Sequence, residues 1–546
     1  MRQTRFLVQV TLLLLLGFAL RVISLGDDSL WSDEAFTVFF ADAPAAEFVP
    51  LLLTDGVHVP LYFLLMRALP TGNDFMLRWP SVLLGVSGIT LLIWVTLRLY
   101  GSRPLALWAG LLLACNPYHI WLSRVARPYA LFFITALLAS YYFLVLLRGE
   151  RSAAHWAGLG LSSAACYMTH FFAAALPLAQ YIVLGFTLQR PFEKLFPPTP
   201  NPSPTRREGL SGRAFLPSPL VGEGPGMGGK GWRTTSQGNR RLLRQWLLVQ
   251  VVALAPLAWW VYRLVTQEVV SFGIAWIPRP ALADLPATLA NMGVGPDGFA
   301  LLLLPALLAL AVGLTAGTYR AWSAWRAVPT DLYWFWLVTL ALLPIFLLSQ
   351  ARPFYVDRYF MVFLPGLLLL TLRGWSALAR GGLGSLKLLS PVTWLAGRSW
   401  AGVLAAIVVI SGTVQVSWSL ANESNERQSW HDASAFVADE YQPGDGFVME
   451  PALSLLPFLR YWQDEALLRA NLVLPQNVLA APHDRLWAIV TSPEVNIHRE
   501  QALGPFDPLA PGDSALSRWL AGQRDHVAAQ HEVNGVAVLL IVQGTD

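Results

Sequence analysis

Acidic residues that could take part in group transfer are concentrated in one polar segment of a very apolar chain. Eight acids lie between Gly26 and Asp74, and two of them, Asp33 and Glu34, are adjacent in the stretch SLWSDEAF. A carboxylate held at a surface can act as a general base and remove the proton from an attacking hydroxyl. The competing interpretation is helix capping, with Ser32 as the N-cap and both acids in the first turn, where the helix dipole favours them.

A histidine and a tyrosine follow in the same segment, in the stretch HVPLYF. His58 could hydrogen-bond a substrate phosphate, with Tyr62 one helical turn further on. It could equally be a polar residue in front of a helix that begins with proline. A third interpretation is a divalent metal held by Glu34 and His58, which would then bind the phosphate.

Arginines and aromatic residues form two further polar stretches, SRVARPYAL and ARPFYVDRYF. The planar guanidinium group can hold a phosphate through two parallel hydrogen bonds, which makes Arg127, Arg352 and Arg358 candidate phosphate ligands, with Tyr129 beside them. His170, in YMTHFF, is a further candidate, or a histidine satisfied at a membrane interface. The alternative for the arginines is that they extend toward lipid headgroups.

The elements that must position these residues are membrane helices. Of the 546 residues, 55% are hydrophobic and 13% are charged, which argues against a soluble enzyme. Two cysteines are too few for a disulfide framework. Runs long enough to span a bilayer predict about eleven transmembrane helices: Phe6–Leu25, Met76–Leu97, Pro104–Leu122, Pro128–Leu147, Ala153–His170, Phe171–Leu188, Leu243–Val265, Gly298–Thr318, Leu332–Ser349, Tyr359–Leu372 and Trp400–Trp418. The apolar stretch Leu61–Leu69 is too short to cross and predicts an interfacial or re-entrant helix.

The distribution of positive charge predicts the orientation of these helices. With the N-terminus inside, 22 of the 31 Lys and Arg residues before Asn422 fall in inner loops, as the positive-inside rule requires. Basic residues placed between hydrophobic spans argue against a nucleic-acid partner. Under this topology all the candidate residues, and the C-terminal tail, lie on the outer face of the cell membrane.

The chain divides into two predicted domains. Residues 1–418 form a transmembrane domain, interrupted at 190–241 by a segment rich in Pro, Gly and Ser that predicts a disordered cytoplasmic insertion. Residues 419–546 are predicted to form a small extracytoplasmic α/β domain. This part of the chain is acidic, with 17 Asp and Glu residues against 7 Lys and Arg residues after Ala421. Its helix is expected at Trp430–Glu440, and its buried strands at Gly446–Met449, Leu486–Thr491 and Val536–Val542.

At these residues the chain resembles a known family. The stretches SLWSDEAFTVFFA, HVPLYFLLMRALP, LRWPSVLLGV, NPYHIWLSRVARPYALFF, THFFAAALPLAQ and PFYVDRYFMVFLPGLLLL, and WHDASAFVADEYQPGDGFV in the tail, are similar to the ordered motifs of bacterial family-39 glycosyltransferases. These are relatives of protein O-mannosyltransferases and of lipid A aminoarabinose transferase. The resemblance implies the polytopic GT-C fold and transfer of a sugar from a polyprenyl-phosphate donor at the outer face.

The resemblance also suggests roles for individual residues. The family's acidic pair falls on Asp33 and Glu34, the first of which would be catalytic. Its His-Pro-Pro-Leu-Tyr-Tyr motif falls on His58–Phe63, with Val59 in place of a proline. Its Ser-Gln-Glu-Ala-Arg motif falls on Ser123–Arg127, where Arg124 and Val125 replace the Gln-Glu pair. This chain would therefore work without that glutamate.

Two other functions fit the same residues. A transporter or flippase of lipid-linked sugars would also place polar groups in a membrane domain, although no clear inverted repeat is found. An inactive binding relative would account for Val125. The acceptor of a transferase of this kind could be a hydroxyl on a protein, a lipid or a glycan.

Overall fold

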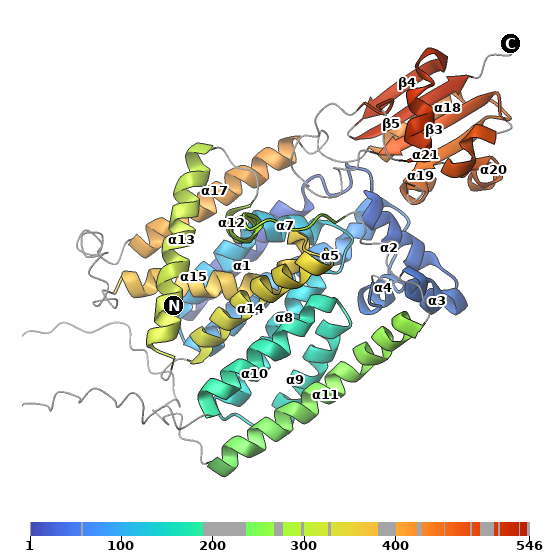
Figure 1. Ribbon diagram of the computed structural model, residues 1–546. Coiled ribbons are helices and arrows are strands. Elements are labelled where there is room, and N and C mark those ends of the chain that lie inside the picture. Colours follow the sequence, from blue (N-terminus) through green and yellow to red (C-terminus); the bar gives the residue numbers. More distant parts are fainter. Residues whose placement is uncertain are drawn as a thin grey trace, which may run out of the picture.

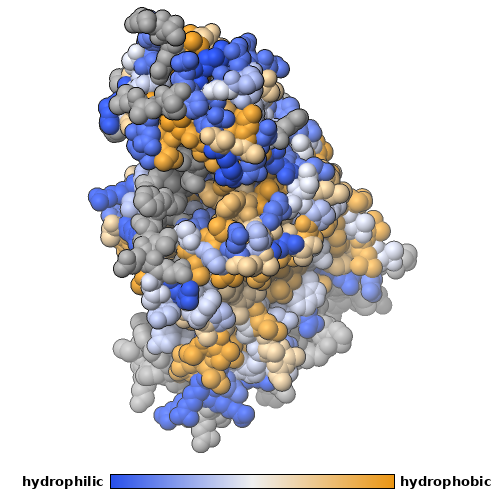
Figure 2. Space-filling view, turned by 90° about the vertical axis from the view of Figure 1, so that its right-hand side faces the viewer, coloured by the Kyte–Doolittle hydropathy of each residue, from blue (hydrophilic) through white to orange (hydrophobic). Residues whose placement is uncertain are grey.

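The computed structural model describes residues 2–55, 58–188, 236–266, 277–295, 300–325, 329–380, 400–422, 429–451, 454–462, 464–480, 483–491, 507–510, 514–533 and 535–542. It has a helical domain with a small α/β domain above one end of it (Figure 1). In Figure 2 the upper part of the molecule is largely hydrophilic, and broad hydrophobic areas lie below it. The predicted fold class is therefore confirmed.

The helical domain contains long helices and several short ones at the end that carries the α/β domain (Figure 1). In chain order they are α1 (Arg2–Val22), α2 (Ser32–Asp42), α3 (Ala45–Asp55), α4 (Leu61–Met66), α5 (Asp74–Tyr100), α6 (Arg103–Ala114), α7 (Pro117–Arg124), α8 (Tyr129–Leu147), α9 (Ala153–Tyr167), η1 (Phe171–Ala174), α10 (Ala175–Leu188), α11 (Ser236–Thr266), α12 (Asp284–Val294), α13 (Ala300–Ser323), α14 (Pro329–Ala351), η3 (Asp357–Phe363), α15 (Leu364–Leu378) and α17 (Trp400–Asn422).

The number of spans is smaller than eleven when judged by length and hydropathy. Within the described ranges nine helices are long and apolar enough to cross a bilayer, and α6 with α7, bent by 58°, makes a tenth. The predicted span that is missing from this count is Ala153–His170. Its helix, α9, has 15 residues and is about 22 Å long, which is too short to be counted. It still returns the chain to the end where α8 begins, because the His170 ring stacks on Phe132 at a centroid distance of 5.0 Å.

The bend between α6 and α7 has a local cause. Asn116 caps α7 by accepting a hydrogen bond from the His119 amide, and Pro117 occupies the first turn, where it lacks an N–H and disfavours helix before it. Two carbonyls at the end of α6, those of Leu113 and Ala114, accept hydrogen bonds from the buried guanidinium of Arg21 of α1. These bonds fix the bend and, with it, the segment that leads to Arg127.

Other predicted elements of this domain agree with the structure in part. The apolar stretch Leu61–Leu69 contains the short helix α4, as expected for a segment too short to cross. Most of the predicted insertion, 190–241, lies outside the described residues. Its last residues belong to α11, which begins at Ser236 and not at Leu243.

The C-terminal domain is a five-stranded sheet with helices on both faces. Its strands are β1 (Gly446–Glu450), β2 (Leu472–Val473), β3 (Arg485–Thr491), β4 (Val527–Val533) and β5 (Val536–Val542), in the order β2-β1-β3-β5-β4. The first three are parallel, and β5 pairs antiparallel with β3 and β4. Its helical segments are α18 (Trp430–Glu440), α19 (Leu455–Tyr461), α20 (Glu465–Ala470), η7 (Pro475–Ala480), α21 (Ala515–Ala521) and η9 (Arg524–His526).

The strand pattern explains why this domain could be recognised from sequence. Side chains of β1 and β3 alternate between two separate cores: Phe447 and Trp487 pack with Trp430 of α18, whereas Val448 and Leu486 pack with Leu516 of α21. A sheet covered on both faces needs nearly continuous apolar strands. The predicted helix and three predicted strands are found at these positions, with ends within one residue.

Candidate active site

Helix α2 carries the acidic pair and begins at Ser32. The N-cap position is Trp31, which has extended backbone and makes no side-chain capping bond, so the expectation that Ser32 is the N-cap is wrong. Asp33 and Glu34 do lie in the first turn, as expected. Because adjacent helical residues point about 100° apart, the two carboxylates enter different environments.

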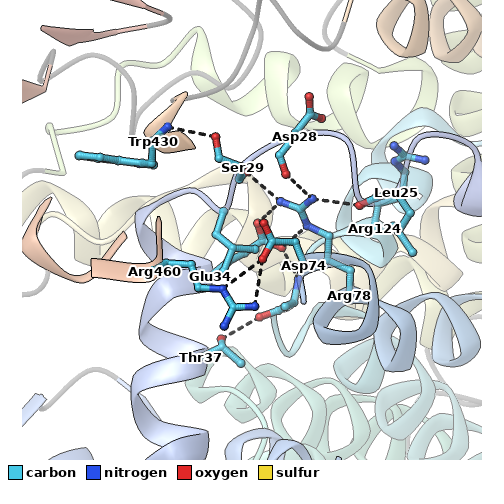
Figure 3. Close-up of polar contacts among 12 residues, drawn as sticks. Leu25, Asp28, Ser29, Glu34, Thr37, Asp74, Arg78, Arg124, Trp430 and Arg460 are labelled. Carbon is cyan, nitrogen blue, oxygen red and sulfur yellow. Dashed lines mark hydrogen bonds and ion pairs between the residues drawn. The ribbon is translucent and has the colours of Figure 1, made fainter. Parts of the chain in front are cut away.

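Glu34 is fully buried beneath the site. Both of its carboxylate oxygens accept hydrogen bonds from Arg78 of α5, at 2.9 and 2.7 Å, and one also accepts from the main-chain N–H of Ala126, at 2.7 Å (Figure 3). This pairing satisfies a buried charge from two sides. It ties the start of α2 to α5 and to the segment before Arg127.

Asp33 faces outward, and 23% of its side chain is exposed. Its Oδ2 atom lies 3.2 Å from Nη2 of Arg358, and its main-chain carbonyl accepts a hydrogen bond of 2.9 Å from Arg127. Burial by itself raises the pKa of this carboxyl, but the charges of Arg358 and then of Arg127 outweigh burial and hold the pKa below its ordinary value of 3.8. Asp33 is therefore ionised at neutral pH.

His58 connects Arg127 to a further acid that the sequence did not single out. Its Nε2 atom lies 2.6 Å from Nη2 of Arg127, and its Nδ1 atom lies 2.6 Å from the carboxylate of Asp55. A guanidinium can only donate, so Nε2 accepts and the ring proton lies on Nδ1, facing Asp55. The Asp55–His58 pair thus orients Arg127. The spacing of three residues between Asp55 and His58 was the available signal.

Arg358 is held in place by the short helix η3 and by aromatic rings. The carboxylate of Asp357, the preceding residue, accepts hydrogen bonds from Thr288 and Asn291 of α12, which fixes the start of η3. The Arg358 guanidinium carbon lies 5.3 Å from the centre of the Trp31 ring and 5.5 Å from that of Tyr359. These rings favour a cation above their faces.

Four other candidate residues lie outside the cluster formed by Asp33, His58, Arg127 and Arg358. Tyr62 is fully buried, and its hydroxyl hydrogen-bonds Ser81 at 3.0 Å. His170 packs against Tyr359, at a centroid distance of 4.9 Å, and so borders the cluster. Arg352 follows the last turn of α14 with an exposed side chain, and no described hydrogen bond or ion pair joins that side chain to the cluster. Tyr129 begins α8, is buried, and faces the charges of Arg358 and Arg127.

The predicted metal pair does not fit a metal. Glu34 uses both oxygens for Arg78 and Ala126, and His58 is engaged on both ring nitrogens. Within the described ranges no group of three His, Cys, Asp or Glu side chains lies close enough to hold a metal ion. The residues that replace the family's Gln-Glu pair are buried: Val125 is apolar, and Arg124 bonds the main-chain oxygens of Arg21 and Ile23.

Comparison with protein families matches one part of the chain. Residues 58–197 match the family model described as dolichyl-phosphate-mannose-protein mannosyltransferase. The matched segment contains His58, Arg127 and His170, whereas Asp33 and Arg358 lie outside it. No curated protein sequence matches the chain significantly.

Solved structures show the same fold over nearly the whole chain. ArnT from Cupriavidus metallidurans in the apo state aligns with a TM-score of 0.53 and 15% identity, covering 99% of this chain and 98% of that one. The same protein bound to undecaprenyl phosphate aligns with a TM-score of 0.53 and 12% identity, covering 97% of each chain. The match over residues 58–197 and the shared fold agree with the family resemblance inferred from the motifs.

Proposed function

We propose that this protein transfers a sugar from a polyprenyl-phosphate donor to an acceptor hydroxyl, with Asp33 as the general base and with Arg127 and Arg358 as ligands of the donor phosphate. The observation that carries the proposal is the convergence on Asp33 of these two guanidinium groups, from segments far apart in sequence: Arg358 pairs with its partly exposed carboxylate, and Arg127 donates to its main-chain carbonyl. Binding of undecaprenyl phosphate by the ArnT of the same fold supports the choice of donor.

The proposed reaction is a displacement at the anomeric carbon. The acceptor oxygen forms the new bond as the bond from the anomeric carbon to the phosphate oxygen breaks, and the electron pair leaves with polyprenyl phosphate. Asp33 takes the acceptor proton, and the arginines stabilise the charge on the departing phosphate. Glu34, which is buried and paired, positions α2 and does not contact substrate.

The ion pair between Asp33 and Arg358 has a role in this sequence of events. In the free site Arg358 holds Asp33 ionised but weakly basic. A phosphate that shares Arg358 would weaken its attraction for Asp33, and the carboxylate would then become a stronger base. The basicity of Asp33 would therefore rise once the donor is bound, at the stage when the acceptor proton must be removed.

We infer that the site faces the outside of the cell. The support is that an N-terminus on the inner side would put 22 of the 31 basic residues before Asn422 in inner loops. On the same topology the cluster residues fall together on the outer side, where Arg358 pairs with Asp33 and Tyr359 contacts His170. A topology reporter can be fused after Asn422. If it were found on the inner side of the membrane, this orientation would be contradicted.

Two alternative functions remain distinguishable from transfer. A flippase would move the donor without cleaving it, and an inactive relative would bind it without cleaving it. Release of undecaprenyl phosphate from an undecaprenyl-phosphate sugar by the purified protein, with a membrane extract as the source of acceptors, would exclude both. The charged residues of the cluster lie at one end of the helices, which favours chemistry at a surface over transport through the bundle.

Substitution of Arg358 by lysine tests the donor-phosphate site. Lysine keeps the charge but loses the planar pair of donors, so Arg358→Lys should bind undecaprenyl phosphate about tenfold or more weakly. Arg352→Lys is the matched control, because Arg352 lies six residues earlier, in the turn between α14 and η3, and its side chain is exposed. Binding would be measured by titration of the purified protein in nanodiscs. Normal affinity in Arg358→Lys and in Arg127→Lys would place the phosphate elsewhere.

A further inference from the structure

The C-terminal domain contacts residues 25–30, the segment that precedes α2 and its Asp33. The last residue of α19, Tyr461, accepts a hydrogen bond of 2.7 Å from the main-chain N–H of Leu30, and its hydroxyl donates to the carboxylate of Asp74. Beside it, Arg460 forms an ion pair of 3.1 Å with Asp74 and donates to the carbonyl of Thr71. The domain is therefore attached to the membrane domain by directed polar contacts next to the site.

A second contact reaches the same segment from α18. The main-chain N–H of Trp430, the first residue of that helix, donates to the hydroxyl of Ser29 at 3.0 Å (Figure 3). The Trp430 side chain is completely buried in the core of the C-terminal domain. Ser29 is thus bonded to a rigid part of that domain.

The membrane domain holds the opposite side of this segment. Arg78 donates to the carbonyls of Leu25, Asp28 and Ser29, each at 3.0 Å, while it also pairs with Glu34 (Figure 3). Residues 25–30 therefore lie between Arg78 below and the C-terminal domain above. Within this segment the Leu30 side chain is also fully buried.

Asp74 and Arg78 link the two sides through one helical turn. They are four residues apart at the start of α5, so they lie on the same face of that helix. A continuous series of contacts runs from Tyr461 to Asp74, along this turn to Arg78, and on to Glu34, the neighbour of Asp33. A second, shorter route runs from Tyr461 to Leu30, which lies three residues before Asp33.

We infer that Tyr461 is a positioning residue for Asp33, so that the docked C-terminal domain is part of the catalytic apparatus. The inference rests on the proposed function of Asp33. A general base acts well only when its carboxylate is held within a fraction of an ångström of the productive position. Tyr461 restrains the backbone immediately before the N-cap Trp31, whose ring also lies under the guanidinium of Arg358.

Removal of one hydroxyl tests this inference. Tyr461→Phe keeps the ring but loses the acceptor for Leu30 and the donor to Asp74. Hydrogen exchange of the backbone of residues 25–33, measured by mass spectrometry, should become about five- to tenfold faster. The rate of sugar transfer should fall by a similar factor, whereas affinity for undecaprenyl phosphate should stay within about twofold, since Arg127 and Arg358 are untouched.

Tyr441→Phe is the matched control, because Tyr441 lies in the same domain and packs against Phe447 and Trp462. It should change neither exchange of residues 25–33 nor turnover. Unchanged turnover in Tyr461→Phe, with turnover lost in Asp33→Asn, would overturn the inference and leave the transfer mechanism standing. A parallel loss of phosphate affinity and turnover in Tyr461→Phe would also overturn it, since a general loss of structure would then be the cause. Full turnover in Asp33→Asn would instead refute the proposed function, on which the inference rests.

Discussion

Asp33→Asn should lower the turnover of sugar transfer by about 10²–10⁴-fold, because an amide cannot accept the proton of the attacking hydroxyl. Asparagine has nearly the same size and still hydrogen-bonds Arg358, so the variant should insert and fold as the parent does. Turnover would be measured on purified protein as release of undecaprenyl phosphate from an undecaprenyl-phosphate sugar. The loss should appear in the rate at saturating donor, because proton removal belongs to the transition state.

Donor binding separates this result from a general loss of structure. Asp33→Asn should bind undecaprenyl phosphate at least as tightly as the parent, since one negative charge beside the phosphate is removed and Arg358 no longer pairs with a carboxylate. If the role of Asp33 were only to favour the helix N-terminus, the variant would lose about 1 kcal/mol of stability or less and keep its turnover. Equal turnover of variant and parent would thus remove Asp33 from the mechanism.

Glu34→Gln should have its largest effect on stability. Glu34 is fully buried and shares two hydrogen bonds with Arg78, whose side chain is 1% exposed. Glutamine cannot neutralise that guanidinium, and an uncompensated buried charge costs about 3–5 kcal/mol. We expect a clear fall in the thermal midpoint of the purified variant, with loss of turnover following from the displaced start of α2.

Glu465→Gln provides the control for that measurement. Glu465 pairs with Arg469 one turn away in α20, and both side chains are more than half exposed. A surface pair of this kind contributes about 0.3–0.5 kcal/mol, so its loss should leave the thermal midpoint nearly unchanged. Similar midpoints for Glu34→Gln and Glu465→Gln would mean that the Glu34–Arg78 pair does not stabilise the fold.

Much of the fold could be predicted because the helices and strands are signalled by hydrophobic runs. The spans at Tyr129–Leu147 and Asp74–Tyr100 lie within a few residues of their predicted limits. By contrast, β4 lies at the edge of the sheet and contains three consecutive polar residues, Gln530, His531 and Glu532, and β2 has only two residues. Neither leaves a pattern that sequence periodicity can detect. The sequence predicts a span at the short α9 because the run of apolar residues continues through the turn at Met168.

The sequence predicts several residues of the cluster but not how they pair, and it does not single out Asp55. Asp33, Arg127 and Arg358 were expected at one surface, and the structure places them in contact. The pairing of Glu34 with Arg78 joins residues 44 positions apart, and nothing in the sequence indicates that this glutamate is buried and paired. Arg352 has the same local sequence character as Arg358. Only the turn between α14 and η3 decides which of the two points toward Asp33.

The position of bound undecaprenyl phosphate tests the central claim most directly. A structure of the purified protein with this lipid, determined by electron cryomicroscopy in nanodiscs, should show phosphate oxygens about 2.7–3.2 Å from guanidinium nitrogens of Arg127 or Arg358, beside Asp33. The contact between Asp33 and Arg358 should lengthen as the phosphate takes its place. A phosphate bound away from both arginines, with that contact unchanged at 3.2 Å, would contradict the assignment of this cluster as the donor site.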